Sequence, residues 1–445
     1  MIRRLRLQIQ RLFGDDLFSL VARGAGVVFG IQVASFGLRY LMHLGLARWM
    51  GAAEYGTYVF VLSVATILGI AAKMGFPTAA LRFVSEYQEA NEWSLLHGVV
   101  RRVWSITFLA GLAVAALACG GIEVLQRIGW VRHPTALQTG VWLIPLLGLL
   151  TLQKQMVRGL EHMILAYAPS YIGRHAFVLL AVGGAYLMTG SVDSVTALIL
   201  TGVGIGIIVF SQAVLGWRTV PTPARRSLPE FRTKKWFRVA LPLLLVASFH
   251  VILGQTDLFL LGVLRESADV GTYNIALKTG TVVTFLLTGI NAIAGPRIAK
   301  MHGSGELDQL QRMVTFVAHL SFWPSFLGGL VLMGISEPFL SLFGSEFTAA
   351  KWAMMIVIVG KLFSAGAGSV GYLANMTGNQ DASARVFGWS AAINVALNLI
   401  LIPQFGIEGA AIATGSTTAL WNVWLCWIVR RELGVVSHVF RKLPL

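Results

Sequence analysis

The sequence predicts an all-helical protein that crosses a membrane many times, and three observations support this fold class. Hydrophobic residues make up 56% of the 445-residue chain and its mean hydropathy is +0.71, whereas soluble domains are roughly 45–50% apolar. Apolar windows of about 20 residues, the length that spans the hydrocarbon layer of a bilayer, recur along the whole chain. These windows do not alternate apolar and polar residues at period two, so helices are favoured over a β-barrel.

We expect twelve membrane spans, six on each side of a basic linker at 217–239. This division predicts an N-terminal lobe at 1–216 and a C-terminal lobe at 240–445, and the basic, amphipathic segment 1–16 is expected to lie along the membrane surface. The expected spans are 17–46, 55–75, 102–121, 136–153, 164–189, 194–216, 240–264, 270–296, 313–335, 351–377, 384–403 and 406–429.

The distribution of basic residues predicts the orientation of these spans. With the N-terminus inside, cytoplasmic segments hold 24 of the 35 Lys and Arg residues and the outer loops hold five. The cytoplasmic count includes Lys154 and Arg158, which follow the fourth window directly. The positive-inside rule therefore places both termini in the cytoplasm. The net charge of +15 then reflects topology, so we expect no nucleic-acid partner.

The two halves of the chain share a pattern at an offset of 215 residues. The triplet at Gly56–Tyr58 recurs at 271–273, and the same offset pairs Leu46 with Leu261, Thr66 with Thr281, and Arg82 with Arg297. An even number of spans separates the copies, which predicts two parallel, pseudo-symmetric six-helix lobes related by an axis along the membrane normal.

Three longer stretches carry a resemblance to a known family. They are LARWMGAAEYGTYVFVLSVATILGIAAKMGFPTAALRFVSEY, then TDLFLLGVLRESADVGTYNIALKTG with AGPRIAKMHGSGELDQLQRM, and finally GYLANMTGNQDASARVFGWSAAINVALNLILIPQFGIEGAAIATG. Together they resemble the polysaccharide-transport (Wzx-like) flippases for O-antigen and exopolysaccharide, members of the multidrug/oligosaccharidyl-lipid/polysaccharide exporter superfamily.

The resemblance implies a function and a place in the cell. It implies export of an undecaprenyl-pyrophosphate-linked oligosaccharide from the inner to the outer leaflet of a bacterial cytoplasmic membrane. The expected route is a cavity between the lobes, lined mainly by spans 1, 2, 7 and 8. Relatives that carry lipid II often have two more C-terminal spans, which disfavours a peptidoglycan precursor as the cargo.

Charged residues inside the expected spans are mostly basic. Apart from Arg102, Lys351, Arg385 and Glu408 in the first three residues of their windows, six cations and a single acid, Asp257, fall within the twelve windows. Charges at membrane depth are costly, so they usually face a water-filled cavity or a partner. One carboxylate cannot neutralise six cations, which predicts a cationic cleft that receives a phosphate-bearing ligand. The cations are Arg23, Arg39, Lys73, Arg174, Lys278 and Lys361.

Among these residues, Arg39 and Lys278 are the main candidates for contact with the pyrophosphate, because they lie nearest the middle of spans 1 and 8. Asp257 shares one face of span 7 with His250. The carboxylate either pairs with a nearby cation or couples transport to H⁺ or Na⁺. His250 can titrate near neutral pH or simply pack through a hydrogen bond.

The other charged candidates have two interpretations each. Arg174 and Lys361 lie deep in their spans, where they either contact substrate or line no cleft at all. Arg23 and Lys73 either join the cationic cleft or extend to the inner membrane surface. Lys73, Arg82 and Arg297 are expected at the cytoplasmic mouth of the transport path, and Arg82 and Arg297 are equivalent in the repeat.

No motif for catalysis or for a resident cofactor or metal is visible in the sequence. The short outer loops disfavour a glycan polymerase or ligase, and the shortage of acids in the spans disfavours a cation-coupled multidrug antiporter. A scaffold would need no charged cleft. The expected partners are a polyprenyl-pyrophosphate-linked glycan, membrane lipids and other membrane proteins of glycan assembly.

Overall fold

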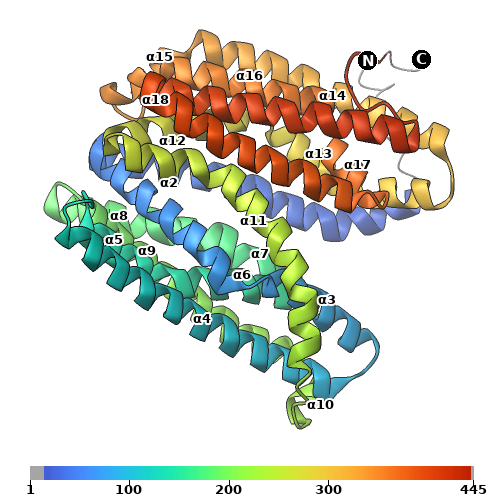
Figure 1. Ribbon diagram of the computed structural model, residues 1–445. Coiled ribbons are helices and arrows are strands. Elements are labelled where there is room, and N and C mark those ends of the chain that lie inside the picture. The colour runs from blue at the N-terminus through green and yellow to red at the C-terminus, as the bar shows by residue number, and fades with distance from the viewer. Residues whose placement is uncertain (1–14, 442–445) are drawn as a thin grey trace. The chain divides into compact units, whose positions relative to one another are not determined.

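The chain folds into long helices, as Figure 1 shows. The computed structural model describes residues 15–441, with side chains from residue 30 onward except at 292, 293, 296 and 299. No strand occurs among these residues, so the predicted all-α membrane fold is confirmed. The amphipathic segment predicted at 1–16 lies almost wholly outside the described residues.

Nine helical segments of the described chain are long and apolar enough to cross a membrane. Two of them each contain two expected spans: α2 (Asp15–Lys73) and α18 (Gln380–Leu433). Gly51 (φ 74°) interrupts the first and Gly406 (φ 58°) the second, at backbone conformations that glycine adopts readily. The expected span 270–296 is divided between α12 (Ser267–Val282) and α13 (Phe285–Gly303). All twelve expected spans are therefore helical.

Contacts group the helices into two units, each described by itself. The N-terminal unit comprises Ile31–Asn274 and Ser341–Phe347. It contains most of α2, the start of α12 and the following helices: α3 (Phe76–Glu89), α4 (Trp93–Arg127), α5 (Pro134–Val141), α6 (Leu143–Gly159), α7 (Met163–Ala168), the π-helix η1 (Pro169–Gly173), α8 (Arg174–Thr189), α9 (Ser194–Thr219), α10 (Thr222–Arg226) and α11 (Thr233–Leu264).

The C-terminal unit comprises Ile275–Leu340 together with residues 15–30 and 348–441. In this unit α16 packs against α14 and α18, and α17 packs against α13 and α18. Its remaining elements are α14 (Leu307–Gly334), α15 (Ser336–Ser341), part of the 3-10 helix η2 (Ser345–Ala350), α16 (Lys351–Ala367) and α17 (Val370–Met376). The lobes predicted at 1–216 and 240–445 stay a prediction.

The 215-residue repeat brings its two copies into reciprocal contact. A Cβ atom on Gly56 would lie 1.7 Å from the carbonyl oxygen of Ser267, and one on Gly271 would lie 2.3 Å from that of Ala52. Ala52 and Ser267 are themselves 215 residues apart. The second half of α2 and the start of α12 therefore cross backbone to backbone, in a register that only residues without a side chain permit.

We expect the Gly56→Ala substitution to destabilise the protein by ~1–3 kcal/mol or more, because the added methyl group must displace main-chain atoms. Gly37→Ala is the matched control, since a Cβ there meets nothing within 4 Å in the same helix. Alanine at position 37 should be neutral or slightly stabilising. Thermal unfolding in detergent, followed by size-exclusion chromatography, measures both. Equal midpoints for the two variants would contradict the close crossing.

The basic linker predicted at 217–239 is packed onto the N-terminal unit. The Glu230 amide donates to the Ser94 carbonyl at 3.0 Å, and His97 Nδ1 lies 2.8 Å from the Ser227 carbonyl. A Cβ on Gly98 would lie 1.8 Å from the Glu230 carbonyl oxygen, so glycine permits the linker to approach α4 this closely. The linker is thus part of the folded unit.

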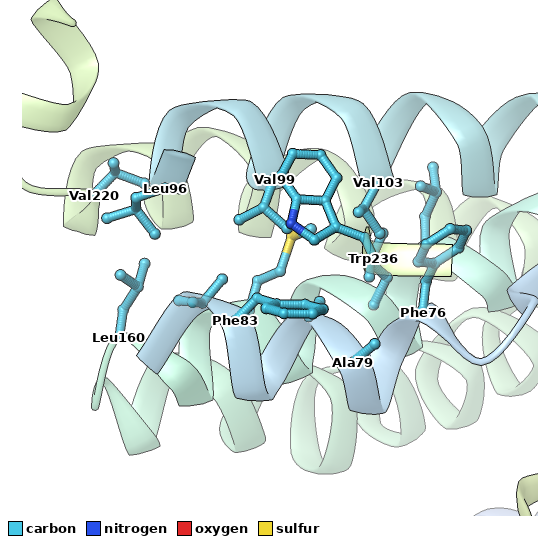
Figure 2. Packing of buried hydrophobic residues seen from close by; sticks show 14 of the residues in the cluster. Phe76, Ala79, Phe83, Leu96, Val99, Val103, Leu160, Val220 and Trp236 are labelled. Carbon is cyan, nitrogen blue, oxygen red and sulfur yellow. The ribbon is translucent and has the colours of Figure 1, made fainter. Parts of the chain in front are cut away.

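Trp236 anchors the beginning of α11 in a hydrophobic cluster (Figure 2). Its side chain is 0% exposed, and its indole N–H donates to the Tyr87 hydroxyl at 3.0 Å. Phe76 and Phe237 pack edge to face beside it, with ring centroids 4.8 Å apart. The cluster contains residues of α3, α4, α6 and α9, among them Ala79, Phe83, Leu96, Val99, Val103, Leu160 and Val220.

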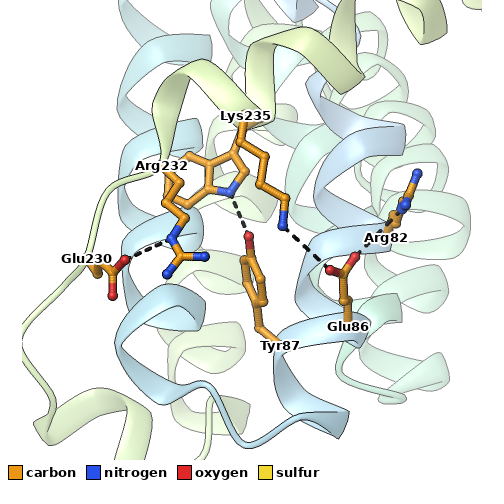
Figure 3. Close-up of polar contacts among 7 residues, drawn as sticks. Arg82, Glu86, Tyr87, Glu230, Arg232 and Lys235 are labelled. Carbon is orange, nitrogen blue, oxygen red and sulfur yellow. Dashed lines mark hydrogen bonds and ion pairs between the residues drawn. The ribbon is translucent and has the colours of Figure 1, made fainter.

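A layer of surface ion pairs covers this anchor (Figure 3). Glu86 lies 3.7 Å from Arg82 and 3.8 Å from Lys235, and Arg232 lies 2.8 Å from Glu230. The hydrogen bond from Arg232 to Glu230 raises the pKa of the guanidinium above its usual value. Such exposed pairs contribute little stability, so the buried indole is the main attachment of the linker.

Candidate functional site

Five basic side chains lie near one another in the N-terminal unit, three of them half-buried and two exposed. Arg174 lies within electrostatic range of Arg39, and Lys154 lies within range of Arg174, Arg158 and Lys73. We call these five residues the cationic cluster. They come from α2, α6 and α8, whose packing around α9 and η1 brings together positions far apart in the sequence.

A π-helical turn positions the aromatic part of the site. Residues Pro169–Gly173 form η1 between α7 and α8, and Pro169 cannot donate a main-chain hydrogen bond there. π-turns of this kind are frequent at functional sites. Tyr171 lies in the turn, and the ammonium group of Lys154 sits 5.3 Å from the centre of its ring. The ring therefore holds one cation of the cluster through a cation–π contact.

Arg174, the first residue after the π-turn, is oriented by its neighbour. Its Nη2 atom lies 3.2 Å from Nε2 of His175, and His175 Nδ1 lies 2.5 Å from the Tyr171 carbonyl oxygen. These contacts assign a neutral imidazole that donates from Nδ1 and accepts at Nε2. Tyr58, hydrogen-bonded to Thr201 at 3.1 Å, lies within electrostatic range of the same guanidinium.

The cluster lacks nearby counter-charges. Within the described part of the chain, no carboxylate lies within 4 Å of any of its five cations. Lys73, Lys154 and Arg174 are half-buried, whereas Arg39 and Arg158 are exposed, and the Arg39 guanidinium lies 5.4 Å from the Phe36 ring centre. Half-buried like charges repel one another, so water or an anionic ligand must stabilise them. The arrangement suits a phosphate-bearing molecule.

The structure joins two of the predicted cleft residues with one residue expected at the cytoplasmic mouth, and it adds two more. Arg39, Arg174 and Lys73 were predicted, whereas Lys154 and Arg158 were expected in a cytoplasmic loop. The helix of the fourth span continues through Gly159, so both residues lie in α6 and not in a loop, whereas their place on the cytoplasmic side stays a prediction. Hydropathy does not reveal that the helix continues, because polar residues directly follow the apolar run Leu143–Leu152. Lys154 and Arg158 are four residues apart, so they lie on the same face of a continuing helix, and this spacing could have identified them.

Other predicted site residues lie outside this cluster. Lys278 on α12 and Lys361 on α16 are half-buried in the C-terminal unit, so a shared pyrophosphate site for Arg39 and Lys278 stays a prediction. Arg297 belongs to α13 of that unit, and Arg82 is paired with Glu86 on the surface of α3. Their role at a cytoplasmic mouth also stays a prediction. The side chain of Arg23 lies outside the described residues.

Asp257 and His250 differ in their surroundings. Asp257 is 2% exposed and accepts hydrogen bonds from the Tyr273 hydroxyl at 2.7 Å and from the Leu258 amide at 2.9 Å. His250 is exposed, and its Nδ1 atom lies 3.0 Å from the Val246 carbonyl one turn earlier in α11. The face of α11 that carries both residues is therefore buried at Asp257 and exposed at His250.

Metal-binding side chains do not cluster in the described part of the chain. There, no group of three His, Cys, Asp or Glu residues could hold a metal ion. The fold and the cationic cluster together define a multi-pass membrane protein with a basic interior.

This chain belongs to the family described as "Polysaccharide biosynthesis protein", whose model matches residues 21–302. A second model, MatE, matches residues 242–400. These matches confirm the resemblance seen in the sequence.

Individual relatives and solved structures agree with the family. The chain is 23% identical over 412 residues to the "Probable low-salt glycan biosynthesis flippase Agl15" of Haloferax volcanii, which covers 91% of this chain and 82% of that protein. An inward-facing multidrug resistance MATE family transporter shares the fold with a TM-score of 0.76 at 11% identity, over 90% of this chain and 94% of the other. The lipid II flippase MurJ matches with a TM-score of 0.71 at 13% identity, over 91% and 87%. These relatives are named as flippases or transporters.

Proposed function

We propose that this protein is a flippase that moves a lipid-linked oligosaccharide from the cytoplasmic to the outer leaflet of a membrane by alternating access. The observation that carries the proposal is the cationic cluster, which offers a half-buried site for a phosphate group inside a chain of the polysaccharide biosynthesis family. The similarity to a glycan flippase supports the same cargo class.

The finer parts of the proposal follow from charge and from the family resemblance. In a bacterial host the carrier lipid would be undecaprenyl pyrophosphate, the location the cytoplasmic membrane, and both termini would lie in the cytoplasm. The phosphates would contact the cluster while the polyprenyl chain remains in lipid. No catalytic step is part of the cycle, and further contacts with glycan-assembly membrane proteins would deliver or receive the cargo.

Reconstituted vesicles test the cargo directly. A fluorescent, short-chain polyprenyl-pyrophosphate disaccharide is placed in both leaflets, and a membrane-impermeant reductant destroys the dye that is accessible outside. Vesicles with the protein should lose all of the fluorescence, and protein-free vesicles only about half. Identical traces for the two preparations would contradict the proposal.

A cation-coupled drug antiporter is the second candidate, because the MatE model matches residues 242–400. Such a transporter needs acidic groups to bind cationic drugs, whereas the cluster consists of cations. The same vesicles, loaded with ethidium under a proton or sodium gradient, separate the two functions. Movement of ethidium without movement of the glycan-lipid would favour the antiporter.

The buried acid Asp257 supports a prediction about energy coupling. We expect Asp257→Asn to keep glycan translocation but to lose its dependence on a proton or sodium gradient, because the amide retains an acceptor for Tyr273 and cannot exchange a proton or attract a cation. Tyr273→Phe is the matched control, since it removes the donor and leaves the carboxylate. An Asp257→Asn variant that responds to gradients like the wild type would make Asp257 a structural residue.

A further inference from the structure

A second cavity lies in the N-terminal unit, between α4, α6 and α9. Its volume is about 440 Å³, which is within the range of small-molecule sites. None of the five cluster cations lines it. Its walls are mainly apolar and include Trp104 and Trp217, and its formally charged lining residue is Arg101. We call this space the α4–α6–α9 cavity.

Two buried amides in its wall are incompletely hydrogen-bonded, and their unpartnered atoms are closed to solvent. Gln153 is 4% exposed and Gln212 is 1% exposed. Among the residues that the structure describes, neither amide atom of Gln153 has a partner, and Oε1 of Gln212 also has none. The Nε2 atom of Gln212 donates to the carbonyl of Leu165 at 2.9 Å, which fixes the orientation of that amide. Buried amides in native proteins are nearly always satisfied, so an occupant of the cavity should offer both hydrogen-bond donors and acceptors.

The lining narrows the chemistry of that occupant. Water would satisfy the amides, but a cavity of this size with mainly apolar walls favours a molecule that also has hydrocarbon. Trp104 stacks on Phe108 with ring centroids 5.5 Å apart, which widens the apolar wall. Arg101 adds a positive charge at the end of α4 that the positive-inside rule places in the cytoplasm. Basic pockets between spans on that side bind anionic lipid headgroups.

We propose that the α4–α6–α9 cavity binds an anionic glycerophospholipid of the inner leaflet. The phosphate is held by Arg101, and an acyl chain packs against Trp104 and Trp217. The Gln153 amide is closed to solvent in this structure, and rotation of its side chain toward the cavity would let headgroup hydroxyls and glycerol oxygens satisfy it. This site is separate from the cationic cluster, so it does not depend on the identity of the transported molecule.

Native mass spectrometry of the purified protein tests the proposal. The probes are phosphatidylglycerol and phosphatidylcholine with identical acyl chains, added at equal concentration to delipidated protein. Wild-type protein should retain phosphatidylglycerol at least about fivefold more than phosphatidylcholine, because a charge-assisted hydrogen bond to Arg101 discriminates between the headgroups. Ala213→Phe, which fills the cavity, and Arg101→Gln should each abolish this preference.

Two neighbouring substitutions serve as matched controls. Val214→Phe adds the same ring on an exposed face of α9, and Arg102→Gln removes an equal charge from a residue that packs on Phe231 at 5.9 Å. Neither position lines the cavity, so both variants should retain phosphatidylglycerol as the wild type does. Loss of lipid in the controls as well as in the cavity variants would overturn the proposal.

Thermal stability gives a second measurement that does not depend on a bulky substitution. Without lipid, Gln153→Leu should unfold at the same or a higher temperature than the wild type, because it removes unpaired buried amide atoms. Phosphatidylglycerol should then raise the midpoint of the wild type more than that of Gln153→Leu. An equal effect of both lipids on the wild type would indicate a water-filled cavity and overturn the proposal. Displacement of bound phosphatidylglycerol by equimolar undecaprenyl phosphate would overturn it in favour of the carrier lipid.

Discussion

Replacing Arg174 with glutamine is expected to slow glycan translocation by about 10- to 100-fold, which corresponds to the loss of one charge-assisted hydrogen bond to phosphate, ~1.5–3 kcal/mol. The same change should leave the thermal midpoint unchanged or raise it. Arg174 lies among cations, and no carboxylate of the described residues is within 4 Å of it, so removing its charge relieves repulsion. Slower transport together with a higher thermal midpoint would show that Arg174 serves transport at the expense of stability.

Lys154→Gln should behave in the same way, and the double variant should lose less than the sum of the two, since both side chains serve one ligand. Arg127→Gln is the control, because this exposed residue is paired with Glu123 at 2.7 Å. Translocation is measured in the vesicle assay and stability by thermal unfolding in detergent. Wild-type rates in both Arg174→Gln and Lys154→Gln would remove the cluster from the transport path.

The largest loss of stability is expected for Trp236→Ala, at ~3–5 kcal/mol for truncation of a buried tryptophan. The indole is fully buried where the linker, α3 and α4 meet, and its removal also leaves the Tyr87 hydroxyl without its donor. Unfolding of this corner should release the linker, because Trp236 is its largest fully buried side chain, and the Phe237 ring, the exposed ion pairs and a few hydrogen bonds are weaker attachments.

A milder substitution separates packing from hydrogen bonding. Trp236→Phe keeps much of the apolar volume and should cost only ~1–3 kcal/mol, mainly from the unpaired hydroxyl. Trp130→Ala is the control, since Trp130 is 80% exposed. Limited proteolysis within the linker at 217–239, combined with thermal unfolding, reports the release. A linker that resists protease in Trp236→Ala would show that other contacts hold it.

The sequence predicted the helical fold well because a bilayer leaves few alternatives. An apolar run of about 20 residues must satisfy its main-chain hydrogen bonds internally, so span positions follow from composition alone. The repeat offset was equally informative, since Gly56 and Gly271 lie against each other at the crossing it implies. Glycine at equivalent positions of two repeats is a pattern that a sequence displays directly.

The cationic cluster was only partly predictable, for two physical reasons. Lys154 follows an apolar run, and hydropathy alone cannot tell a cation within the last turn of a span from one in the next loop. The π-turn at 169–173 inserts one extra residue between α7 and α8, which rotates Arg174 by ~100° relative to a continuous α-helix. Faces assigned from regular helical spacing are therefore misplaced after Pro169.

The linker was predicted as a connection and proved to be an integral part of a folded unit. Its basic and proline-containing composition is typical of exposed segments. Nothing in that composition indicates that the main chain of the linker packs directly against Gly98 of α4. The hydrogen-bond partner of Trp236, Tyr87, lies 149 residues earlier in the chain, and a local pattern does not reveal such a pair.

The crossing of Gly56 with Ser267 and Gly271 has a consequence for biosynthesis. The first helices of the chain reach their final neighbours only after the ribosome has translated some 215 further residues, about 10–45 s later at 5–20 residues per second. During that interval the newly inserted spans expose a bare glycine surface to lipid or to the insertion machinery. A nascent chain arrested before residue 256 should therefore be captured by membrane chaperones, whereas one arrested well beyond residue 274 should resist them.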